Sequence, residues 1–244
     1  MTKNYYFISD LHLGLESKEC ENLKEKTLEN FLNSVKGDCD KLFILGDLFD
    51  YWFEYKRVLQ KGYFRTFTAL QDLSESGAEI HYLIGNHDFL HRDFFEKEIG
   101  CKVYNEELTI ELDNKKFFLG HGDGLVANDT GYKILKRVLR NKFAQKLYSI
   151  LHPDFGIWLA SSTSKTSRDY TTKKNYGEID GLFETAKIKI DQGYDYVIFG
   201  HSHNLCQEEY KNGSYINLGS WLEKPRVGKF SNNKFEIIDW KYNG

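Results

Sequence analysis

The chain has 244 residues, 41% of them hydrophobic, so it is long enough to bury one large core. Its formal net charge of −3 gives no signature of nucleic-acid binding, and no apolar run approaches the roughly 18 residues of a membrane-spanning helix. The amino terminus lacks the apolar segment of a signal peptide, and the four cysteines show no CxxC spacing. We therefore expect one cytoplasmic domain spanning 1–244, with reduced thiols.

The first part of the chain alternates short apolar runs with amphipathic segments. Buried strands are predicted at 4–9, 41–45, 79–84, 116–119 and 194–199, with helices near 20–35 and 59–75 between the first three. Strands separated by helices of this length are typical of βαβ units and a parallel sheet.

The C-terminal part follows a different pattern. Short strands around Asn-Gly and Asn-Asn turns are predicted at 205–210, 214–218, 226–230 and 234–240. These strands are expected to be antiparallel. We therefore expect an α/β fold with a mixed sheet system and helices outside it.

The segment 128–192 interrupts the strands and is predicted to be a helical insertion. Apolar residues recur every three or four positions from Ile134 to Leu151, which predicts an amphipathic helix, and a second helix is expected near 178–192. From Lys133 to Lys174 there are ten Lys or Arg and two Asp or Glu, a local balance of +8. This combination fits either a core-packing helix with a solvated basic face or a lid over acyl chains that faces anionic lipid.

Each of the five predicted core strands ends in an apolar run, usually a glycine, and then Asp, Asn or His. The clusters are Asp10 and His12; Asp47 and Asp50; Asn86, His87 and Asp88; His121 and Asp123; and His201 and His203. One such cluster alone is ordinary turn chemistry. Because ligand sites in open α/β sheets form beyond the carboxyl ends of the strands, we expect all five clusters to converge on one crevice.

The converging side chains have a mixed oxygen and imidazole character. The candidate metal ligands are Asp10, His12, Asp47, Asn86, His121, His201 and His203. Such a set suits borderline divalent ions such as Mn, Fe, Co or Zn better than calcium or a structural zinc site. The set is too large for one tetrahedral site but suffices for two ions if one carboxylate bridges them. Two ions roughly 3.5–4 Å apart are a known arrangement for in-line displacement at phosphorus.

The ordered motifs Asp10-x-His12, GDLFD (46–50), GNHD (85–88), GH (120–121) and GHSH (200–203) resemble those of calcineurin-like metallophosphoesterases over about residues 6–203. This resemblance implies a four-layer αββα sandwich of two mixed sheets with two divalent ions. Mn²⁺ is expected first, with Fe²⁺ or Zn²⁺ as alternatives. One ion would take Asp10, His12, Asp47 and His203, and the other would take Asp47, Asn86, His121 and His201.

The same resemblance implies roles in catalysis. The ions would supply hydroxide for attack at phosphorus, and His87 would donate a hydrogen bond or a proton as charge develops. Asp88 would orient His87. Asp50 and Asp123 would position neighbouring ligands.

A narrower set of motifs, FISDLHLG, LGDLFDYW, GNHDF and GHSHN with the basic insertion, is similar to UDP-2,3-diacylglucosamine hydrolases. This implies cleavage of the pyrophosphate of UDP-2,3-diacylglucosamine to UMP and 2,3-diacylglucosamine 1-phosphate in lipid A biosynthesis. The implied substrate contacts are Asn86, His87, Asp129, Tyr132, Ser164, Lys173 and His201, with Lys165 or Arg168 as alternatives in the loosely aligned part. The implied partners are this lipid-linked nucleotide and, peripherally, the anionic cytoplasmic face of the inner membrane. Neither nucleic acid nor an obligate protein partner is expected.

His87 departs from this narrower pattern, since many of these hydrolases have arginine in the third motif. Arginine clamps a phosphate as a fixed charge, whereas histidine can also exchange a proton. One alternative is therefore a metallophosphoesterase for cyclic nucleotides, phosphomonoesters, phosphoproteins or nucleic acid. A second alternative is a non-catalytic metal-binding scaffold, which predicts lost ligands, yet no ligand is missing.

Overall fold

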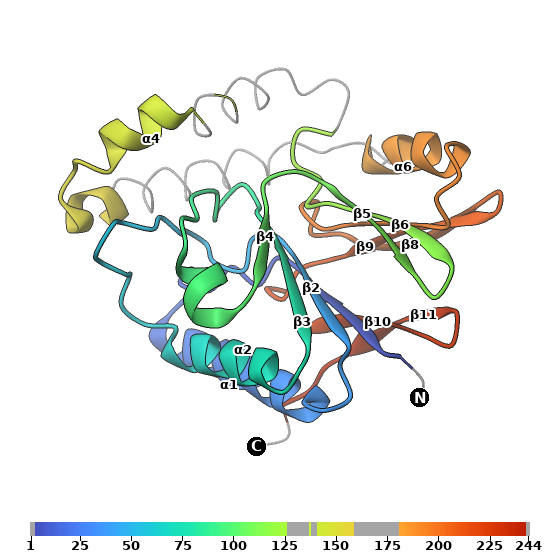
Figure 1. Cartoon of the computed structure of the whole chain (residues 1–244), viewed down its shortest axis with the longest axis horizontal. Helices are drawn as coiled ribbons and strands as arrows, with labels where there is room; N and C mark the ends of the chain where they lie inside the picture. The colour runs from blue at the N-terminus through green and yellow to red at the C-terminus, as the bar shows by residue number, and fades with distance from the viewer. Residues whose placement is uncertain (1–2, 126–136, 138–140, 159–180, 243–244) are drawn as a thin grey trace.

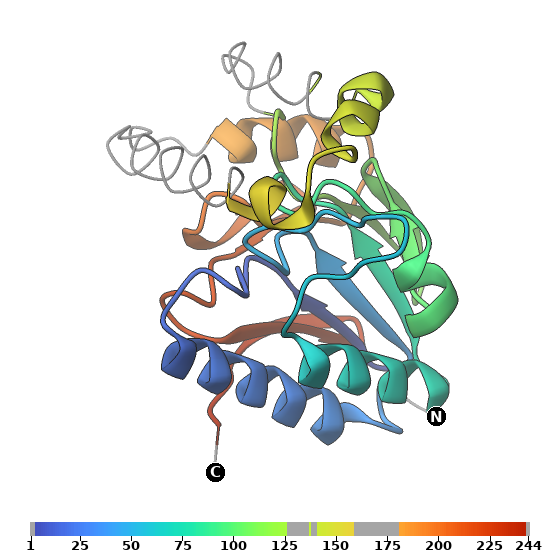
Figure 2. The same cartoon turned by 90° about the vertical axis from the view of Figure 1, so that its left-hand side faces the viewer.

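The computed structural model describes residues 3–125, 137, 141–158 and 181–242, and two mixed sheets packed face to face form its centre (Figure 1). In spatial order the first sheet contains β11 (Lys234–Asp239), β10 (Arg226–Ser231), β1 (Tyr5–Ile8), β2 (Lys41–Leu45), β3 (Glu79–Leu83) and β4 (Lys102–Tyr104). The second contains β5 (Leu108–Leu112), β6 (Lys115–Leu119), β7 (Tyr196–Phe199), β9 (Gly213–Leu218) and β8 (Leu205–Tyr210). Helices cover the outer faces of both sheets, so the predicted αββα layers are confirmed (Figure 2).

Every predicted strand forms, with ends within two residues of those expected. The strands β1, β2 and β3 pair in parallel, as do β6 and β7, while β8–β9 and β10–β11 are antiparallel hairpins. The sequence analysis missed β4 and β5. Both lie at sheet edges and leave some of their side chains exposed, so neither produces a continuous apolar run.

The helices α1 (Lys18–Val35) and α2 (Phe64–Glu75) pack on the outer face of the first sheet, and α6 (Gly181–Asp191) packs on the second. A short π-helical turn, η1 (Phe95–Ile99), was not predicted. The helix α2 begins later than expected because Gly62 and Tyr63 have left-handed φ angles of 97° and 60°. Within the described residues, every helix is too short or too polar to reach across a lipid bilayer.

The inner core lies between the sheets and is rich in aromatic rings. Phe43 of β2 is fully buried there, with its ring centroid 4.9 Å from that of Phe7 and 4.7 Å from that of His81. We expect Phe43→Ala to lower the free energy of unfolding by about 3–5 kcal/mol, through lost burial and the cavity left behind. Urea denaturation in EDTA measures this loss. The control is Phe64→Ala, because Phe64 is 80% exposed and should change stability by no more than about 0.5 kcal/mol.

His81 gives this core a predictable acid sensitivity. Burial lowers the pKa of His81 to about 4; the charge of Glu79 opposes this shift, whereas those of Lys41 and Lys102 add to it. An unfolded histidine titrates near 6.5, so the unfolded chain binds a proton that the native chain does not. The contribution of neutral His81 to stability is therefore complete above pH 6.5 and is lost progressively as the pH falls towards about 4.

Urea midpoints in EDTA between pH 7.5 and 5 check this expectation. The variant His81→Gln should lose less stability over this interval than the wild type. The slopes of unfolding free energy against pH should differ by at most the uptake of about one proton on unfolding. Identical pH dependence in the two proteins would contradict it.

The described part of the predicted insertion contains α4 (Lys142–Tyr148) and a helical segment at 153–158. Asn141 is extended, and its side chain accepts hydrogen bonds from the backbone N–H groups of Phe143 and Ala144. A new helix therefore begins after Asn141, and the prediction of one continuous helix from Ile134 to Leu151 is wrong.

The helix α4 does not pack into a core. Phe143 is 70% exposed, Leu147 is also exposed, and no residue of α4 is buried, so the core-packing alternative does not hold for this helix. Tyr148 attaches α4 to the loop after β2: it packs against Phe53 and its hydroxyl lies 3.1 Å from that of Tyr51. The apolar side chains of α4 are thus presented to the surroundings close to the loop that carries Asp47 and Asp50.

Candidate metal centre

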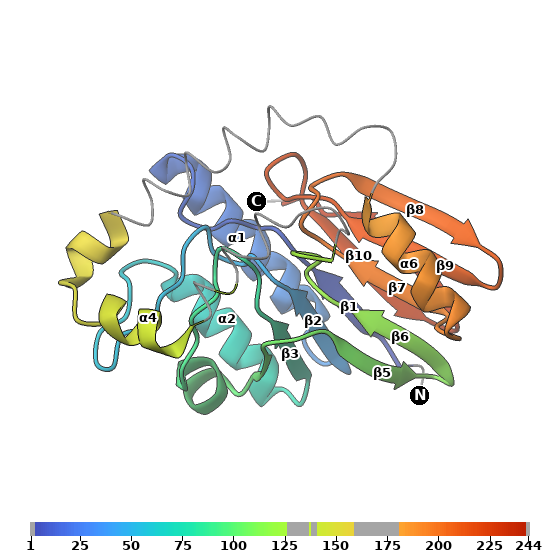
Figure 3. The ribbon, with the colours of Figure 1, turned by 90° about the horizontal axis from the view of Figure 1, so that it is seen from above.

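The five predicted clusters all lie on loops that follow β1, β2, β3, β6 and β7. Figure 3 views the sheets from above, with β1, β2 and β3 of the first beside β6 and β7 of the second. Because parallel strands end at the same edge, their following loops meet where the two sheets face each other. The distances below show that the side chains do meet there.

One group of side chains surrounds the Nε2 atom of His12. This atom lies 3.0 Å from Nε2 of His203, 3.8 Å from Oδ1 of Asp10 and 3.7 Å from Oδ2 of Asp47. Nε2 of His203 is also 3.4 Å from Oδ1 of Asp10. Two imidazole nitrogens and two carboxylates therefore face a common point.

A second group lies on the other side of Asp47. Nε2 of His121 is 3.2 Å from Oδ2 of Asp47 and 2.9 Å from Oδ1 of Asn86. Nδ1 of His201 is 2.9 Å from the same Asn86 oxygen. The Asp47 carboxylate thus lies between the two groups, where a bridging ligand would lie.

The donor chemistry of these groups fits divalent cations. Nδ1–H of His121 donates a hydrogen bond of 2.9 Å to the carbonyl oxygen of Leu45, so the lone pair of neutral His121 is on Nε2 and points at the Asn86 oxygen. In neutral His121 this lone pair and the Asn86 oxygen are both available as ligands to a cation between them. A histidine held through its other ring nitrogen in this way is typical of metal sites.

The backbone at these positions is strained. Left-handed φ angles occur at Asp10 (53°), His12 (47°), Asp47 (51°), His201 (66°) and His203 (60°). Such conformations are uncommon for residues other than glycine, and they persist where the surrounding structure imposes them, often at functional sites. Five of the seven candidate ligands share this feature. It indicates that the loop conformations are imposed by the surrounding structure and orient these side chains towards one another.

The glycines before the ligands are required by close approach. A Cβ atom on Gly85 would collide with the Asp47 carboxylate, and one on Gly200 would collide with the Asp10 carboxylate. Glycine at both positions allows neighbouring loops to approach until their carboxylates and imidazoles form one cluster.

The buried charges of the cluster shift one another's pKa values. Burial by itself raises the pKa of Asp10, but hydrogen bonds to His12 and His203 outweigh it and hold that pKa well below its usual range. Burial opposes the charged form of His12 and His121, yet the carboxylates around them raise their pKa values to about 9 and about 10. Protons on these two histidines thus supply positive charge in the metal-free protein, and cation binding is expected to release them.

Comparison with known proteins agrees with this geometry. Residues 4–205 match the calcineurin-like phosphoesterase family. The chain belongs to this family. It is 31% identical over 240 residues to a UDP-2,3-diacylglucosamine hydrolase of Porphyromonas gingivalis, which covers 91% of this chain and 92% of that protein. A UDP-2,3-diacylglucosamine hydrolase of Haemophilus influenzae is 30% identical over 224 residues, with coverages of 90% and 91%. Among solved structures, an archaeal phosphodiesterase aligns over 97% of this chain and 99% of its own, with a TM-score of 0.49 and 15% identity.

His87 lies beside the ligand cluster of this phosphoesterase. Its ring centroid is 4.9 Å from that of His12, and its backbone N–H donates to Oδ1 of Asp47. Nδ1–H of His87 donates a hydrogen bond of 3.0 Å to the carbonyl oxygen of Asp50, whose carboxylate is 3.6 Å from the same nitrogen. This contact orients the imidazole beside the ligand cluster.

The expectation that Asp88 orients His87 is corrected by these contacts. The Asp88 carboxylate is fully buried and accepts hydrogen bonds from the backbone N–H groups of Gly85 and Leu48 and from the hydroxyl of Tyr82. Asp88 therefore fastens the loop after β3 to the loop after β2, and Asp50 is the residue next to the His87 imidazole. Asp50 also lies 3.4 Å from Nδ1 of His12, as a residue that positions a ligand should.

Lys24 supports the site but was missed by the sequence analysis. It lies on α1, is almost fully buried, and its ammonium donates hydrogen bonds to the carbonyl oxygens of Leu11 and His12. Glu16 and Glu21 balance its charge. The sequence did contain a signal for this burial, because Lys24 lies four positions before Leu28 and therefore on the apolar face of the helix.

Several predicted substrate contacts lie outside the described residues and stay predictions. These are Asp129, Tyr132, Ser164, Lys165, Arg168 and Lys173. Asp123, expected to position neighbouring ligands, is described and buried on the loop after β6.

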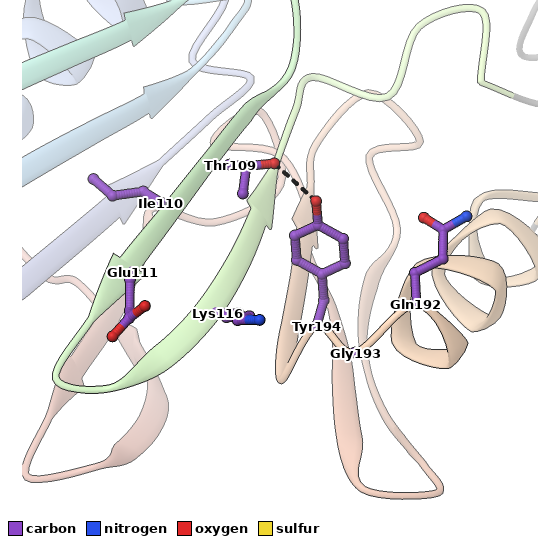
Figure 4. Close-up of a pocket in the computed structure, with 7 residues that line it drawn as sticks. All are labelled: Thr109, Ile110, Glu111, Lys116, Gln192, Gly193 and Tyr194. Carbon is purple, nitrogen blue, oxygen red and sulfur yellow. Dashed lines mark hydrogen bonds between the residues drawn. The ribbon is translucent and has the colours of Figure 1, made fainter.

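A cavity of about 340 Å³ lies elsewhere on the phosphoesterase (Figure 4). Its lining residues are Thr109, Ile110, Glu111, Lys116, Gln192, Gly193 and Tyr194. None of these is a candidate ligand, and Gln192, Gly193 and Tyr194 precede β7, whereas His201 and His203 follow it. The cavity is therefore separate from the site where the chemistry is concentrated.

Proposed function

We propose that this phosphoesterase uses two divalent ions, Mn²⁺ first, to cleave the pyrophosphate of UDP-2,3-diacylglucosamine. The products would be UMP and 2,3-diacylglucosamine 1-phosphate, as part of lipid A biosynthesis. Two observations together support this proposal. Two ligand groups share Asp47, and relatives named UDP-2,3-diacylglucosamine hydrolases align with this chain over about nine-tenths of their length.

Each ion has a candidate set of ligands within the described residues. Asp10, His12, Asp47 and His203 would hold one, and Asp47, Asn86, His121 and His201 would hold the other. Bound there, the ions would make hydroxide available near neutral pH and would neutralise phosphoryl oxygens. The protein contributes the fixed separation of the two groups, because the Asp47 carboxylate is fully buried and cannot shift without unpacking the loops.

His87 would act on the substrate directly. Its Nδ1–H is held by the Asp50 carbonyl, and Nε2 would donate to a phosphoryl or leaving-group oxygen when the ring is protonated. Asn86 and His201 would contact the same phosphate from the other side of the centre. The remaining substrate contacts would come from Asp129, Tyr132, Ser164, Lys173 and Lys165 or Arg168, which lie outside the described residues.

The exposed apolar side chains near the centre favour an amphiphilic substrate. Phe143, Ile150 and Trp158 are all more than half exposed, and Lys142 and Lys146 flank them. Apolar side chains beside lysines suit contact with acyl chains and anionic lipid. We therefore place the enzyme at the cytoplasmic face of the inner membrane, attached peripherally.

A substrate panel with Mn²⁺ tests the proposal. It compares UDP-2,3-diacylglucosamine with p-nitrophenyl phosphate esters, cyclic nucleotides, phosphopeptides and DNA, with chelated enzyme as the blank. The expected result is that UDP-2,3-diacylglucosamine is cleaved at least tenfold more efficiently than the others, and that reaction in ¹⁸O-water labels UMP. If the enzyme prefers a different phosphoester, that compound replaces UDP-2,3-diacylglucosamine as the proposed substrate. His87 in the GNHD motif is the feature that favours such an alternative.

Vesicle binding tests the membrane part separately. Phe143→Glu/Ile150→Glu should reduce co-sedimentation with phosphatidylglycerol-containing vesicles about tenfold or more, because it places charge where acyl chains are met. The control is Phe64→Glu, which changes another highly exposed phenylalanine on α2. Equal co-sedimentation of the double variant and the wild type would remove the membrane from the proposal.

A further inference from the structure

The end of β9 and the turn that follows it, residues 217–221, lie against the metal centre although they supply no ligand. Asn217 and Ser220 are its two polar side chains, and each is almost completely buried. Buried polar groups are retained where they satisfy a specific partner. Their partners here are the two loops that carry Asp10 and the His201–His203 pair.

Asn217 is tied to the loop of the two histidines. Its amide Nδ2 donates a hydrogen bond of 2.6 Å to the carbonyl oxygen of Gly200, the residue before His201. Its Oδ1 accepts from the backbone N–H of Gly219 at 3.2 Å, which fixes the orientation of the amide. Because Asn217 pairs with Phe199 across β7 and β9, it holds the carbonyl at the point where the strand becomes the ligand loop.

Ser220 is tied to the loop of Asp10. Its hydroxyl donates to the carbonyl oxygen of Asp10 at 3.1 Å, and the backbone N–H of Trp221 donates to the same oxygen at 3.1 Å. The Asp10 carboxylate in turn accepts from the backbone N–H of His201 at 3.0 Å. Hydrogen bonds therefore link Asn217 and Ser220 to the loop of Asp10 and to the loop that carries His201 and His203.

Both anchored loops need support because Asp10, His201 and His203 have left-handed φ angles. A strained loop relaxes when a restraint is removed, and relaxation separates ligands that must meet one ion. We propose that Asn217 and Ser220 are positioning residues that set the distance between the Asp10 loop and the His201–His203 loop, and thereby the affinity for metal. This inference rests on the two-ion centre of the proposed function, but not on the identity of the substrate.

Ser220→Ala is the sharper of two variants. It removes one donor to the Asp10 carbonyl while Trp221 keeps the other, and it also removes the acceptor of the Leu222 backbone N–H at 3.2 Å, so the restraint on the Asp10 loop is weakened rather than abolished. Asn217→Asp keeps the shape but replaces the donor to Gly200 by an acceptor. The matched control is Ser214→Ala. Ser214 lies on β9, as Asn217 does, and its hydroxyl donates to Glu209 and not to a ligand loop.

Mn²⁺ titration of the chelator-treated full chain, with free Mn²⁺ followed by electron paramagnetic resonance, measures the effect. We expect Ser220→Ala and Asn217→Asp to weaken at least one of the two Mn²⁺ sites by about 10–100-fold, the usual effect of removing a residue that orients ligands. Ser214→Ala should bind as the wild type does. Melting temperatures of the variants and the wild type are compared in EDTA. A variant that is destabilised without metal has a structural role, whereas weaker Mn²⁺ binding at an unchanged melting temperature indicates positioning of the ligands.

Two outcomes would overturn the inference. One is Mn²⁺ affinity of Ser220→Ala within twofold of the wild type at both sites. The other is equal weakening by Ser214→Ala. A wild-type protein that binds two Mn²⁺ ions but leaves UDP-2,3-diacylglucosamine intact would refute the proposed substrate and leave this inference standing, so the two failures are distinguishable.

Discussion

Asp47→Ala is expected to reduce Mn²⁺-dependent turnover by at least about 10³-fold. Oδ2 of Asp47 lies 3.7 Å from Nε2 of His12 and 3.2 Å from Nε2 of His121, so this one side chain serves both ligand groups. Each bound ion contributes several kcal/mol of transition-state stabilisation, and about 4 kcal/mol corresponds to about 10³-fold in rate. Turnover is measured with the phosphoester that the wild type prefers.

Metal content separates this effect from misfolding. Asp47→Ala should retain fewer than two Mn²⁺ ions per chain after equilibrium dialysis. Asp72→Ala is the control, because Asp72 lies on the surface of α2 and pairs only with Lys36 among the described contacts. Two tightly bound ions in Asp47→Ala, with turnover within tenfold of the wild type, would show that Asp47 does not bridge.

His87→Ala is expected to lower kcat by about 10²–10⁴-fold and to leave the Mn²⁺ content unchanged. General acid–base catalysis contributes a factor of this size, and the Asp50 carbonyl orients the His87 imidazole through Nδ1 beside the ligand cluster. His152→Ala is the matched control, since the His152 side chain is 74% exposed on the segment after α4. Steady-state kinetics and metal analysis on the same samples measure both quantities.

The outcome for metal content decides between two roles of His87. An unchanged ion count with reduced kcat supports action on the substrate. Loss of an ion in His87→Ala would instead make His87 a ligand, as its position in a group with His12 and Asp47 would permit. A kcat within fivefold of the wild type would remove His87 from the catalytic step.

The core strands and the convergence of the site were predictable because both depend on local patterns. A buried parallel strand must be a short continuous apolar run, such as KLFIL at 41–45, and its end must be followed by a turn. Asp, Asn or His after five such runs, preceded by glycine in four of them, put the ligands on one edge of the sheets whatever the details of packing. The structure brings those side chains within hydrogen-bonding distances of one another.

The partner of His87 was not predictable from the motif. Asp88 is its neighbour in sequence, but successive side chains of a turn point in different directions, and Asp88 points into the loops that it fastens. Asp50 is distant in sequence and reaches His87 only because the loop after β2 returns beside the loop after β3. Asn217 and Ser220 were equally hidden, since a buried asparagine in a strand has no pattern that indicates its partner.

The insertion shows the same limit in another form. Spacings of three and four residues predict a helix with an apolar face, and α4 has that face. Periodicity does not say what covers the face, and in the described part of the chain Phe143 and Ile150 are left exposed. The break at Asn141 arises from a side-chain cap, which competes locally with continuation of the helix.

By itself, therefore, the sequence determined the strands of a mixed α/β fold and the set of side chains that meet at the strand ends, because these follow from patterns within short segments. The resemblance of its motifs to a known family implied the arrangement in two sheets. Only the tertiary structure decided which residue orients His87, which residues restrain the ligand loops, and that the apolar face of α4 remains open. Each of these depends on contacts between segments that are far apart in the chain, and short-range patterns carry no record of such contacts.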